Sequence, residues 1–425
     1  MITARDQGLE LAADPSRVVA RLFLPGESVG PSISRVGLIA GRVNALPLET
    51  ATHLAANILA DFTPRHVDFR RTLAENATAA MATIGGHAAV DDAHGVVFGA
   101  SVTSEYAVEG AALCNPSPVI HPDQTGLAAG QLRVAVSLRG IGEGHVSSLG
   151  FTSAVVGPGE TWTFEPRDAP LASATVTRGG GAWSSYHSDF ATTTTLSQRV
   201  IQPVVDEERN GVEDARFVRF THDDGTTEYR ATYTAYDGEK VTPRLLVSRD
   251  LANFASHNLI GPASTNKGVA LFPRRVHGDL LAIVRSDGET NSLARSDDGI
   301  EWHGERAIRR PQQPWELVLS GNCGSPLETE RGWLVLTHGV GPMRVYSMSA
   351  ILLDLDDPSV LIAALAHPFL TSTGAKQNGY VPNVVYSCGG LIHDSVLWMP
   401  HGVGDNRIRV AALGVDELID AMTRV

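Results

Sequence analysis

The chain has 425 residues, of which 43% are hydrophobic and 19% charged, a composition typical of globular proteins and a length that fits one large β architecture or two domains. A formal net charge of -13 and the lack of any basic run argue against nucleic-acid binding, which needs clustered Lys and Arg. The cysteines Cys114, Cys323 and Cys388 are far apart and form no C-x-x-C pair, so neither a disulfide framework nor a zinc site is predicted. The sequence contains no run of about 18 apolar residues, so no membrane span is predicted. We therefore expect a soluble protein in the reducing cytoplasm.

A helical pattern covers residues 47–81. Leu54, Ile58, Leu59 and Phe62 recur at three- and four-residue spacing and predict a helix over 50–62. A second helix is predicted over 64–81. Each has one apolar face that must be buried, so we expect a homo-oligomer with these helices as a source of interface. This region belongs to a predicted N-terminal helical extension, residues 1–95.

Short β-rich runs alternate with Gly, Asp and Asn turns over residues 96–425, the predicted second domain. The runs are Leu132–Leu138, Phe217–Thr221, Arg230–Tyr236, Leu280–Val284, Trp333–Thr337 and Val396–Pro400. Such spacing indicates an all-β sandwich, barrel or propeller. Only near the C-terminus, over 415–422, does a short helix signal return.

Two segments of this region look alike. The first is Ser-Arg-Asp-Leu-Ala-Asn-Phe at 248–254 and the second is Ser-Asp-Asp-Gly-Ile-Glu-Trp at 296–302. Each places a serine, an aspartate, a tight turn and an aromatic residue in the same order. A repeated unit of this kind favours propeller blades over a sandwich, although the period is looser than in WD-type repeats.

Two carboxylates and a guanidinium lie within four positions in the segment 210–217, Asn-Gly-Val-Glu-Asp-Ala-Arg-Phe. In an extended strand alternate side chains share a face, so Asp214 and Arg216 are expected on one face and Glu213 on the other. One face would then carry a proton donor beside a cation. A salt-bridged strand edge would show the same pattern.

None of the 15 histidines forms an H-x-H or H-E-x-x-H cluster, so the sequence predicts no metal site. Other polar residues occur at strand ends and turns of the β region. Taken singly, each polar residue could be structural. The set consists of Asn115, Ser117, Arg139, Glu143, His145, Lys267, Arg285, His338 and Asp405.

The order of these residues along the chain resembles the family-130 glycoside hydrolases and phosphorylases, which act on β-mannosides. The resemblance covers residues 105–425. Its carriers are Cys-Asn-Pro-Ser at 114–117, Val-Glu-Asp-Ala-Arg at 212–216 where the family commonly has E-D-P-R, Lys267 with Leu-Phe-Pro at 271–273, Arg285, Gly-Trp-Leu to His-Gly-Val at 332–340, Gly-Tyr-Val-Pro-Asn-Val-Val at 379–385, and Gly-Asp at 404–405. The resemblance implies a five-bladed β-propeller with the active site at the mouth of its channel.

The resemblance also implies residue roles. Asp214 matches the family's proton donor, and Asn115, Ser117, Arg139, Glu213, Arg216 and Asp405 match or adjoin positions that hold the sugar. Burial beside Glu213 is expected to raise the pKa of Asp214, while Arg216 opposes that shift. The partners implied are a β-mannoside oligosaccharide and inorganic phosphate as co-substrate, with no other cofactor.

Phosphate recognition is where the chain departs from the family pattern. Lys267 stands where arginine is common, Arg285 and His338 are kept, and Leu319 stands where we would place a lysine. Three donors remain for the dianion. The first expectation is an inverting phosphorylase that releases α-mannose 1-phosphate, the alternative is an inverting β-mannosidase that uses water, and a third is a sugar-binding propeller without catalysis.

Overall fold

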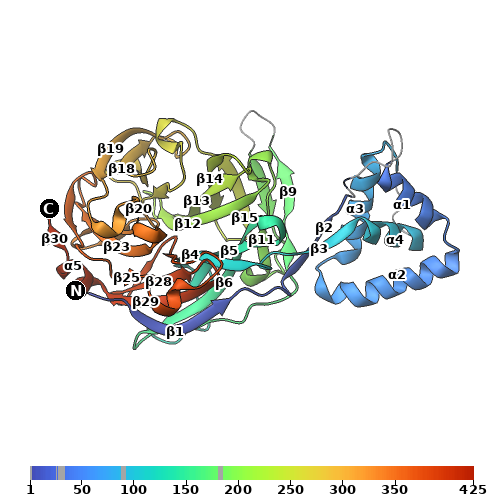
Figure 1. Ribbon diagram of the computed structural model, residues 1–425, viewed down its shortest axis with the longest axis horizontal. Coiled ribbons are helices and arrows are strands. Elements are labelled where there is room, and N and C mark those ends of the chain that lie inside the picture. Colours follow the sequence, from blue (N-terminus) through green and yellow to red (C-terminus); the bar gives the residue numbers. More distant parts are fainter. Residues whose placement is uncertain (1, 25, 27–33, 88–91, 180–184) are drawn as a thin grey trace. The chain divides into compact units, whose positions relative to one another are not determined.

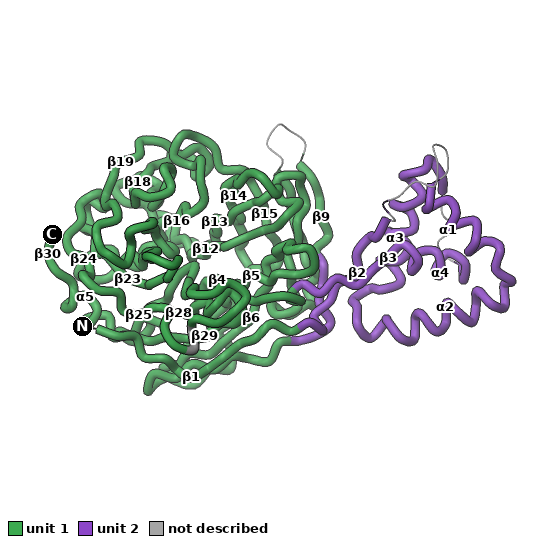
Figure 2. Tube along the Cα trace, in the orientation of Figure 1, with its two compact units in different colours: residues 1–14, 109–167, 174–425 green, residues 15–108, 168–173 purple. Residues whose placement is uncertain are grey.

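The computed structural model describes residues 2–24, 26, 34–87, 92–179 and 185–425, and the chain forms two compact units. Unit 1 contains residues 1–14, 109–167 and 174–425, and unit 2 contains residues 15–108 and 168–173 (Figure 2). The predicted boundary between residues 95 and 96 falls within the helix α4 (Ala93–Ser101). The division into domains at that point stays a prediction.

Unit 2 is mainly helical. Its elements are β2 (Val18–Leu22), α1 (Arg35–Asn44), α2 (Leu48–Phe62), the 3₁₀ turn Thr63–Arg65, α3 (Phe69–Ala82), α4 (Ala93–Ser101), β3 (Thr103–Ala107) and β8 (Ala172–Ser173). Strands β2 and β3 pair in antiparallel fashion. The helices share an apolar core that includes Leu73 and Phe98.

The helix predicted over 50–62 is confirmed by α2, but the helix predicted over 64–81 begins later, at Phe69. The intervening residues form a 3₁₀ turn that has a proline near its start. Asp68 then has a left-handed backbone conformation, with φ 51°. The sequence did not predict α1 and α4. Each contains two glycines, which weaken a helix signal. The middle of α4 is also buried over Gly95–Gly99, so α4 has no clear polar face from which a 3.6-residue period could be read.

Unit 1 consists of antiparallel sheets joined by turns (Figure 1). The largest sheet includes β4 (Ala112–Ile120), β5 (Leu132–Ile141), β6 (Ser147–Gly157), β7 (Thr161–Phe164), β9 (Thr175–Arg178), β10 (Tyr186–Asp189), β11 (Arg199–Ile201), β12 (Gly211–Thr221), β13 (Thr227–Tyr236), β14 (Val241–Ser248) and β15 (Asn253–Asn258). A four-stranded sheet has the order β16 (Ala270–Leu271), β17 (Leu280–Val284), β18 (Asn291–Ser296), β19 (His303–Arg309).

Two further sheets complete unit 1. One contains β20 (Leu319–Asn322), β21 (Leu327–Thr329), β22 (Gly332–Val340), β23 (Tyr346–Leu353), β24 (Leu361–Ala364), β25 (Leu370–Thr371) and β30 (Thr423–Arg424). The other joins β1 (Arg5–Ala12) to β29 (Arg407–Gly414), β28 (Val396–Val403), β26 (Val385–Tyr386) and β27 (Leu391–His393). The short helix α5 (Val415–Asp420) confirms the C-terminal helix signal.

Each β run named from the sequence lies within a strand: β5, β12, β13, β17, β22 and β28. The chain is therefore mostly β-sheet with few helices. No helix in the part of the chain that the structure describes is long and apolar enough to cross a membrane.

The two similar segments form the same turn in two sheets. Ser248 Oγ accepts a hydrogen bond from the backbone N–H of Leu251 at 2.9 Å, and Ser296 Oγ accepts one from Gly299 at 2.8 Å. Asp250 and Asp298 each accept two further backbone N–H groups. The turns connect β14 to β15 and β18 to β19, so the sequence similarity marks equivalent hairpins.

Candidate functional site

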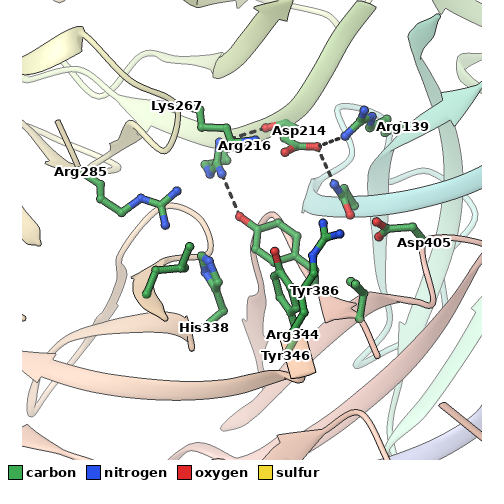
Figure 3. Close-up of a pocket in the computed structure, with 13 residues that line it drawn as sticks. Arg139, Asp214, Arg216, Lys267, Arg285, His338, Arg344, Tyr346, Tyr386 and Asp405 are labelled. Carbon is green, nitrogen blue, oxygen red and sulfur yellow. Dashed lines mark hydrogen bonds and ion pairs between the residues drawn. The ribbon is translucent and has the colours of Figure 1, made fainter. Parts of the chain in front are cut away.

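A polar pocket of about 280 Å³ lies in unit 1 and gathers most of the predicted site residues (Figure 3). Its lining consists of Asn115, Arg139, Asp214, Arg216, Lys267, Arg285, Leu319, His338, Arg344, Tyr346, Val384, Tyr386 and Asp405. Residues that are far apart in the sequence, from Asn115 to Asp405, thus converge on one pocket, as the expectation of a single site requires.

Two residues that were given a role in the site, Ser117 and Glu213, lie outside this lining, as do Glu143 and His145 of the wider polar set. Ser117 is fully buried, and its Oγ accepts a hydrogen bond from the backbone N–H of Phe217 at 3.0 Å. It therefore holds β12 next to β4 rather than facing the pocket. Glu213 does not line the pocket but contacts Arg139, which does.

Backbone irregularities aim Asn115 and Asp214 into the pocket. The ladder between β4 and β5 shifts register between Cys114 and Ser117, and the ladder between β12 and β13 shifts between Glu213 and Arg216. Asn115 has φ 50° and Asp214 has φ 54°, values that Asn and Asp tolerate better than other non-glycine residues. The Nδ2 of Asn115 donates a hydrogen bond to Asp214 Oδ1 at 2.5 Å.

Arg139 binds both neighbouring carboxylates. Its Nη1 donates to Asp214 Oδ1 at 3.0 Å, its Nη2 to Glu213 Oε1 at 2.6 Å, and its Nε to Ser147 Oγ at 2.9 Å. The expectation that Glu213 points away from Asp214 is therefore wrong. Strand alternation requires a regular extended backbone, and the bulge with its positive φ at Asp214 breaks that alternation.

Cations surround the buried carboxylate of Asp214. Burial alone would raise its pKa, but Arg139, Lys267, Arg216 and the hydrogen bond from Asn115 together lower the pKa of Asp214 to about 2. The expected rise in this pKa is therefore not found, because the sequence did not reveal how many cations surround the carboxylate. Burial does raise the pKa of Glu213, and the charge of Asp214 adds to that rise while Arg139 opposes it.

Asp405 carries the most strongly raised carboxyl pKa of the pocket lining. Burial raises the pKa of Asp405 to about 6, the Asp214 charge adds to the rise, and Arg139 opposes it. Asp405 has φ 45° and follows Gly404, with φ 61°. Two consecutive residues with a left-handed backbone conformation, directly after β28, thus bring this carboxyl group to the pocket.

Lys267, Arg285 and His338 lie on one side of the pocket, which we call the cationic side, and Arg139 and Asp405 lie on the opposite side, with Asp214, Arg216 and Tyr386 between them (Figure 3). Burial and the neighbouring Arg216 lower the pKa of Arg285, although the phenol of Tyr386 opposes this. The Nε atoms of Arg285 and Arg216 are buried and have no hydrogen-bond partner among the described residues. Buried guanidinium groups with unused N–H donors favour an anionic ligand.

Arg216 and His338 are each fixed by aromatic neighbours. Arg216 Nη2 donates to the Tyr386 hydroxyl at 2.9 Å, and Nη1 donates to the Asp214 carbonyl at 3.2 Å. His338 stacks on Tyr346 at 6.0 Å between ring centroids and meets Tyr386 edge-on at 4.9 Å. Burial, then the charges of Arg285, Arg216 and Lys267, lower the pKa of His338 well below its usual range, so its ring is neutral.

The sequence did not identify four lining residues: Arg344, Tyr346, Val384 and Tyr386. Arg344 follows Met343 in a turn where both have positive φ, 58° and 56°. This backbone conformation is costly for residues with long side chains. The sequence does not predict it here, because no glycine or asparagine stands at either position. Leu319, expected in the phosphate region, does line the pocket. Among the residues described, no group of three or more His, Cys, Asp or Glu side chains could hold a metal ion.

Comparisons with known proteins find similar sequences and a similar fold. The glycoside hydrolase family 130 model, described as beta-1,4-mannooligosaccharide phosphorylase, matches residues 187–424. A 1,2-beta-oligomannan phosphorylase of Thermoanaerobacter sp. (strain X514) is 31% identical over 230 residues, which cover 52% of this chain and 75% of that protein. A beta-1,2-mannobiose phosphorylase of the same strain is 32% identical over 213 residues, covering 49% of this chain and 68% of that protein.

The fold is also similar to a solved structure. The beta-1,2-mannobiose phosphorylase from Listeria innocua, in complex with beta-1,2-mannobiose, superposes with a TM-score of 0.53 at 19% identity. The superposition covers 74% of this chain and 92% of that protein. At this identity the similarity concerns the fold.

Proposed function

Because the chain belongs to glycoside hydrolase family 130, we propose that it cleaves β-mannosides with inorganic phosphate, with inversion, and releases α-mannose 1-phosphate and a shortened sugar. The observation that carries the proposal is the pocket itself. It places a carboxylate, Asp214, between a cationic side with unused buried N–H donors and an opposite side rich in polar groups. A dianion and a neutral sugar need these two environments side by side.

We assign the proton-donor role to Asp214 and sugar binding to Asn115, Arg139, Arg216 and Asp405. Ser117 and Glu213 act through these residues, since Ser117 supports the backbone of β12 and Glu213 holds Arg139. Phosphate is assigned to Lys267, Arg285 and His338. The reaction so assigned needs no cofactor beyond phosphate. Fixed donors of this kind orient the reactants, and orientation supplies much of the rate in such reactions.

A proton donor with a pKa of about 2 would be ionised at neutral pH, so the proposal requires that the ligands change this value. Two of the cations that lower the pKa of Asp214 are Lys267 and Arg216. A phosphate dianion at Lys267 would offset their charge and add a like charge close to Asp214, and a sugar would exclude water. Both effects raise a carboxyl pKa. Substrate binding therefore moves Asp214 toward the protonated form that the reaction needs.

The five-bladed propeller is the proposed architecture of unit 1. Its support is that the strands fall into five successive antiparallel groups: β4 to β7, β12 to β15, β16 to β19, β20 with β22 to β24, and β26 with β28, β29 and β1. The first two groups share a sheet through one parallel contact between Gly211 and Ser147. The pocket takes residues from the first strand of each group, or from the segment just before it, at Asn115, Asp214, Lys267, Leu319 and Tyr386.

Hydrolysis by water is the alternative, because Leu319 occupies the pocket where the family pattern led us to expect a lysine. One experiment separates the two. The protein is incubated with β-1,2-, β-1,3- and β-1,4-mannobiose, with and without phosphate, and the products are followed by phosphorus and proton NMR. We place the β-1,2 substrate first, since the two curated relatives described above carry names with that linkage.

Phosphate-dependent formation of α-mannose 1-phosphate supports the proposal. Release of free mannose at the same rate without phosphate would show that the protein is a hydrolase instead. Binding of mannobiose without any cleavage would favour a sugar-binding protein.

A cytoplasmic location and a homo-oligomer belong to the same proposal. The first is supported by three buried cysteines that are free, and the second by exposed apolar side chains on α2, Leu48 and Leu54.

A further inference from the structure

We propose that Cys323 is a positioning residue for the anion site, because its thiol sets the tautomer of His338. The Sγ of Cys323 lies 3.4 Å from His338 Nδ1. Both side chains are buried, with relative exposures of 0% and 4%. The inference rests on the proposed function, in which His338 faces phosphate, and it adds a residue that acts through His338 without touching the ligand.

The strand geometry explains the contact. In the antiparallel ladder of β20 and β22, Gly321 lies opposite His338, and Cys323 is two residues further along, so its side chain is on the same face as Gly321. A Cβ at Gly321 would come within 2.8 Å of His338 Cε1 and 2.6 Å of Arg285 Nη1. Glycine at 321 thus leaves room for the imidazole and the guanidinium, and the next side chain on that face reaches the ring.

The direction of the hydrogen bond follows from the protonation states. Burial raises the pKa of the Cys323 thiol, so it remains an S–H group, and the surrounding cations keep His338 neutral. A neutral imidazole has one donor nitrogen and one acceptor nitrogen. When the thiol donates to Nδ1, the proton of the ring must sit on Nε2. The single N–H that remains to donate to an anion is then Nε2–H.

This tautomer matters for an anion. The oxygens of a phosphate dianion are hydrogen-bond acceptors, so a neutral histidine adds to its binding through an N–H and opposes it through a lone pair. Because Leu319 supplies no charge, the three donors Lys267, Arg285 and His338 carry the assigned contacts on this side. Loss of one correctly oriented N–H should therefore weaken phosphate and leave the mannoside unaffected.

The first test is direct. The protein is labelled with ¹⁵N-histidine, and the tautomer of His338 is read from its two nitrogen shifts, assigned by comparison with His338→Gln. We expect the Nε2–H form in the wild type and in Cys323→Ser, which keeps a hydroxyl donor, and a mixture of tautomers in Cys323→Ala. An Nδ1–H form in the wild type would overturn the inference whatever reaction the protein catalyses.

The second test is kinetic. Cys323→Ala should raise the KM for phosphate about threefold to tenfold, the range expected for loss of one hydrogen bond, with the KM for the mannoside unchanged, and Cys323→Ser should restore the wild-type value. Cys388→Ala is the matched control, since it removes an equally buried thiol from the same core cluster. Equal changes in both KM values, or no rescue by serine, would show that Cys323 acts only in packing. Absence of any phosphate-dependent reaction in the wild type would instead reject the proposed function and leave the tautomer result standing.

Discussion

Asn115 and Asp214 occupy matching irregularities in β4 and β12, each with a positive φ, and the amide of Asn115 donates to the carboxylate of Asp214 at 2.5 Å. The two bulges turn both side chains into the pocket. Asn and Asp are the non-glycine residues that tolerate this backbone conformation best. Exchange of Asp214 for asparagine therefore removes the acid without adding backbone strain.

Asp214→Asn should abolish turnover while the protein stays folded. Asparagine cannot give a proton, and general-acid assistance contributes about 10²–10⁴ in rate. The measurement is kcat for phosphorolysis of an unactivated β-mannobiose, with the melting temperature recorded beside it. Asp224→Asn, an exposed turn residue, is the control. A variant with more than about a tenth of the wild-type rate would place the proton donor elsewhere.

Glu213 and Arg139 should behave as one unit. Glu213→Gln weakens a charge-assisted contact of 2.6 Å. It should lower kcat/KM up to about tenfold, because the amide oxygen can still accept from Arg139 and only part of the about 1.5–3 kcal/mol of such a bond is lost. Arg139→Lys cannot bind two carboxylates in the same fork. Because both changes affect the same contact, the double variant should lose clearly less than the product of the single losses. Independent, multiplying losses would mean that the contact has no role in catalysis.

The sequence predicted the members of the pocket better than their geometry. The family resemblance located Asp214, Lys267, Arg285, His338 and Asp405, because each lies in a segment that matches the family pattern. It could not place Glu213, since strand alternation assumes a regular backbone and the bulge is visible only in the ladder register.

The expected rise in the pKa of Asp214 is not found, for a similar reason. The pKa of Asp214 depends on Arg139, Lys267 and Arg216 together, and the sequence placed only Arg216 beside the acid. Arg344 was missed because it enters the pocket from a segment without a local chemical signature, and Tyr386 was missed although it directly follows the motif at 379–385. In unit 2, α4 was missed because a helix buried through its middle shows no amphipathic period.

Asp405 should make stability depend on pH. Its pKa is raised from 3.8 to about 6 in the folded protein, first by burial and further by Asp214. The folded state therefore holds this proton more tightly, so the contribution is fully present below pH 3.8 and is lost as the pH rises through about 6. A shift of this size corresponds to about 3 kcal/mol. Asparagine does not titrate and avoids the loss.

The check is urea unfolding of the wild type and Asp405→Asn at two values, about pH 4 and about pH 7.5, which lie on either side of this transition. The free energy of unfolding of the variant relative to the wild type should rise by about 2.4 kcal/mol between them, because part of the loss has already occurred at pH 4. The same variant should bind mannobiose more weakly at neutral pH, because an anionic acceptor has become a neutral amide. An equal difference in stability at both pH values would contradict the raised pKa.

Arg285→Ala should raise the KM for phosphate at least tenfold and leave the KM for the mannoside close to the wild-type value. Arg285 lies on the cationic side of the pocket (Figure 3). It is assigned a contact with the anion and none with the sugar ring, so its removal should weaken the binding of phosphate alone. Arg306→Ala, whose side chain is 65% exposed in a long ion pair, is the control. Loss of mannoside affinity with unchanged phosphate affinity would reverse the assignment of the two sides.

Leu319→Lys should tighten phosphate binding. The side chain of Leu319 lines the pocket beside Arg285 and His338, where a lysine would add a charge-assisted donor worth up to about 2 kcal/mol, or roughly thirtyfold in the KM for phosphate. The gain is limited by repulsion from the cations already present, which the dianion must offset. Leu317→Lys, in the same segment but 69% exposed, adds the same charge outside the pocket lining and should leave the KM within about twofold, since exposed charges are screened. A lower KM in both variants would indicate attraction of phosphate by net charge alone, and an unchanged KM in Leu319→Lys would mean that the anion lies away from β20.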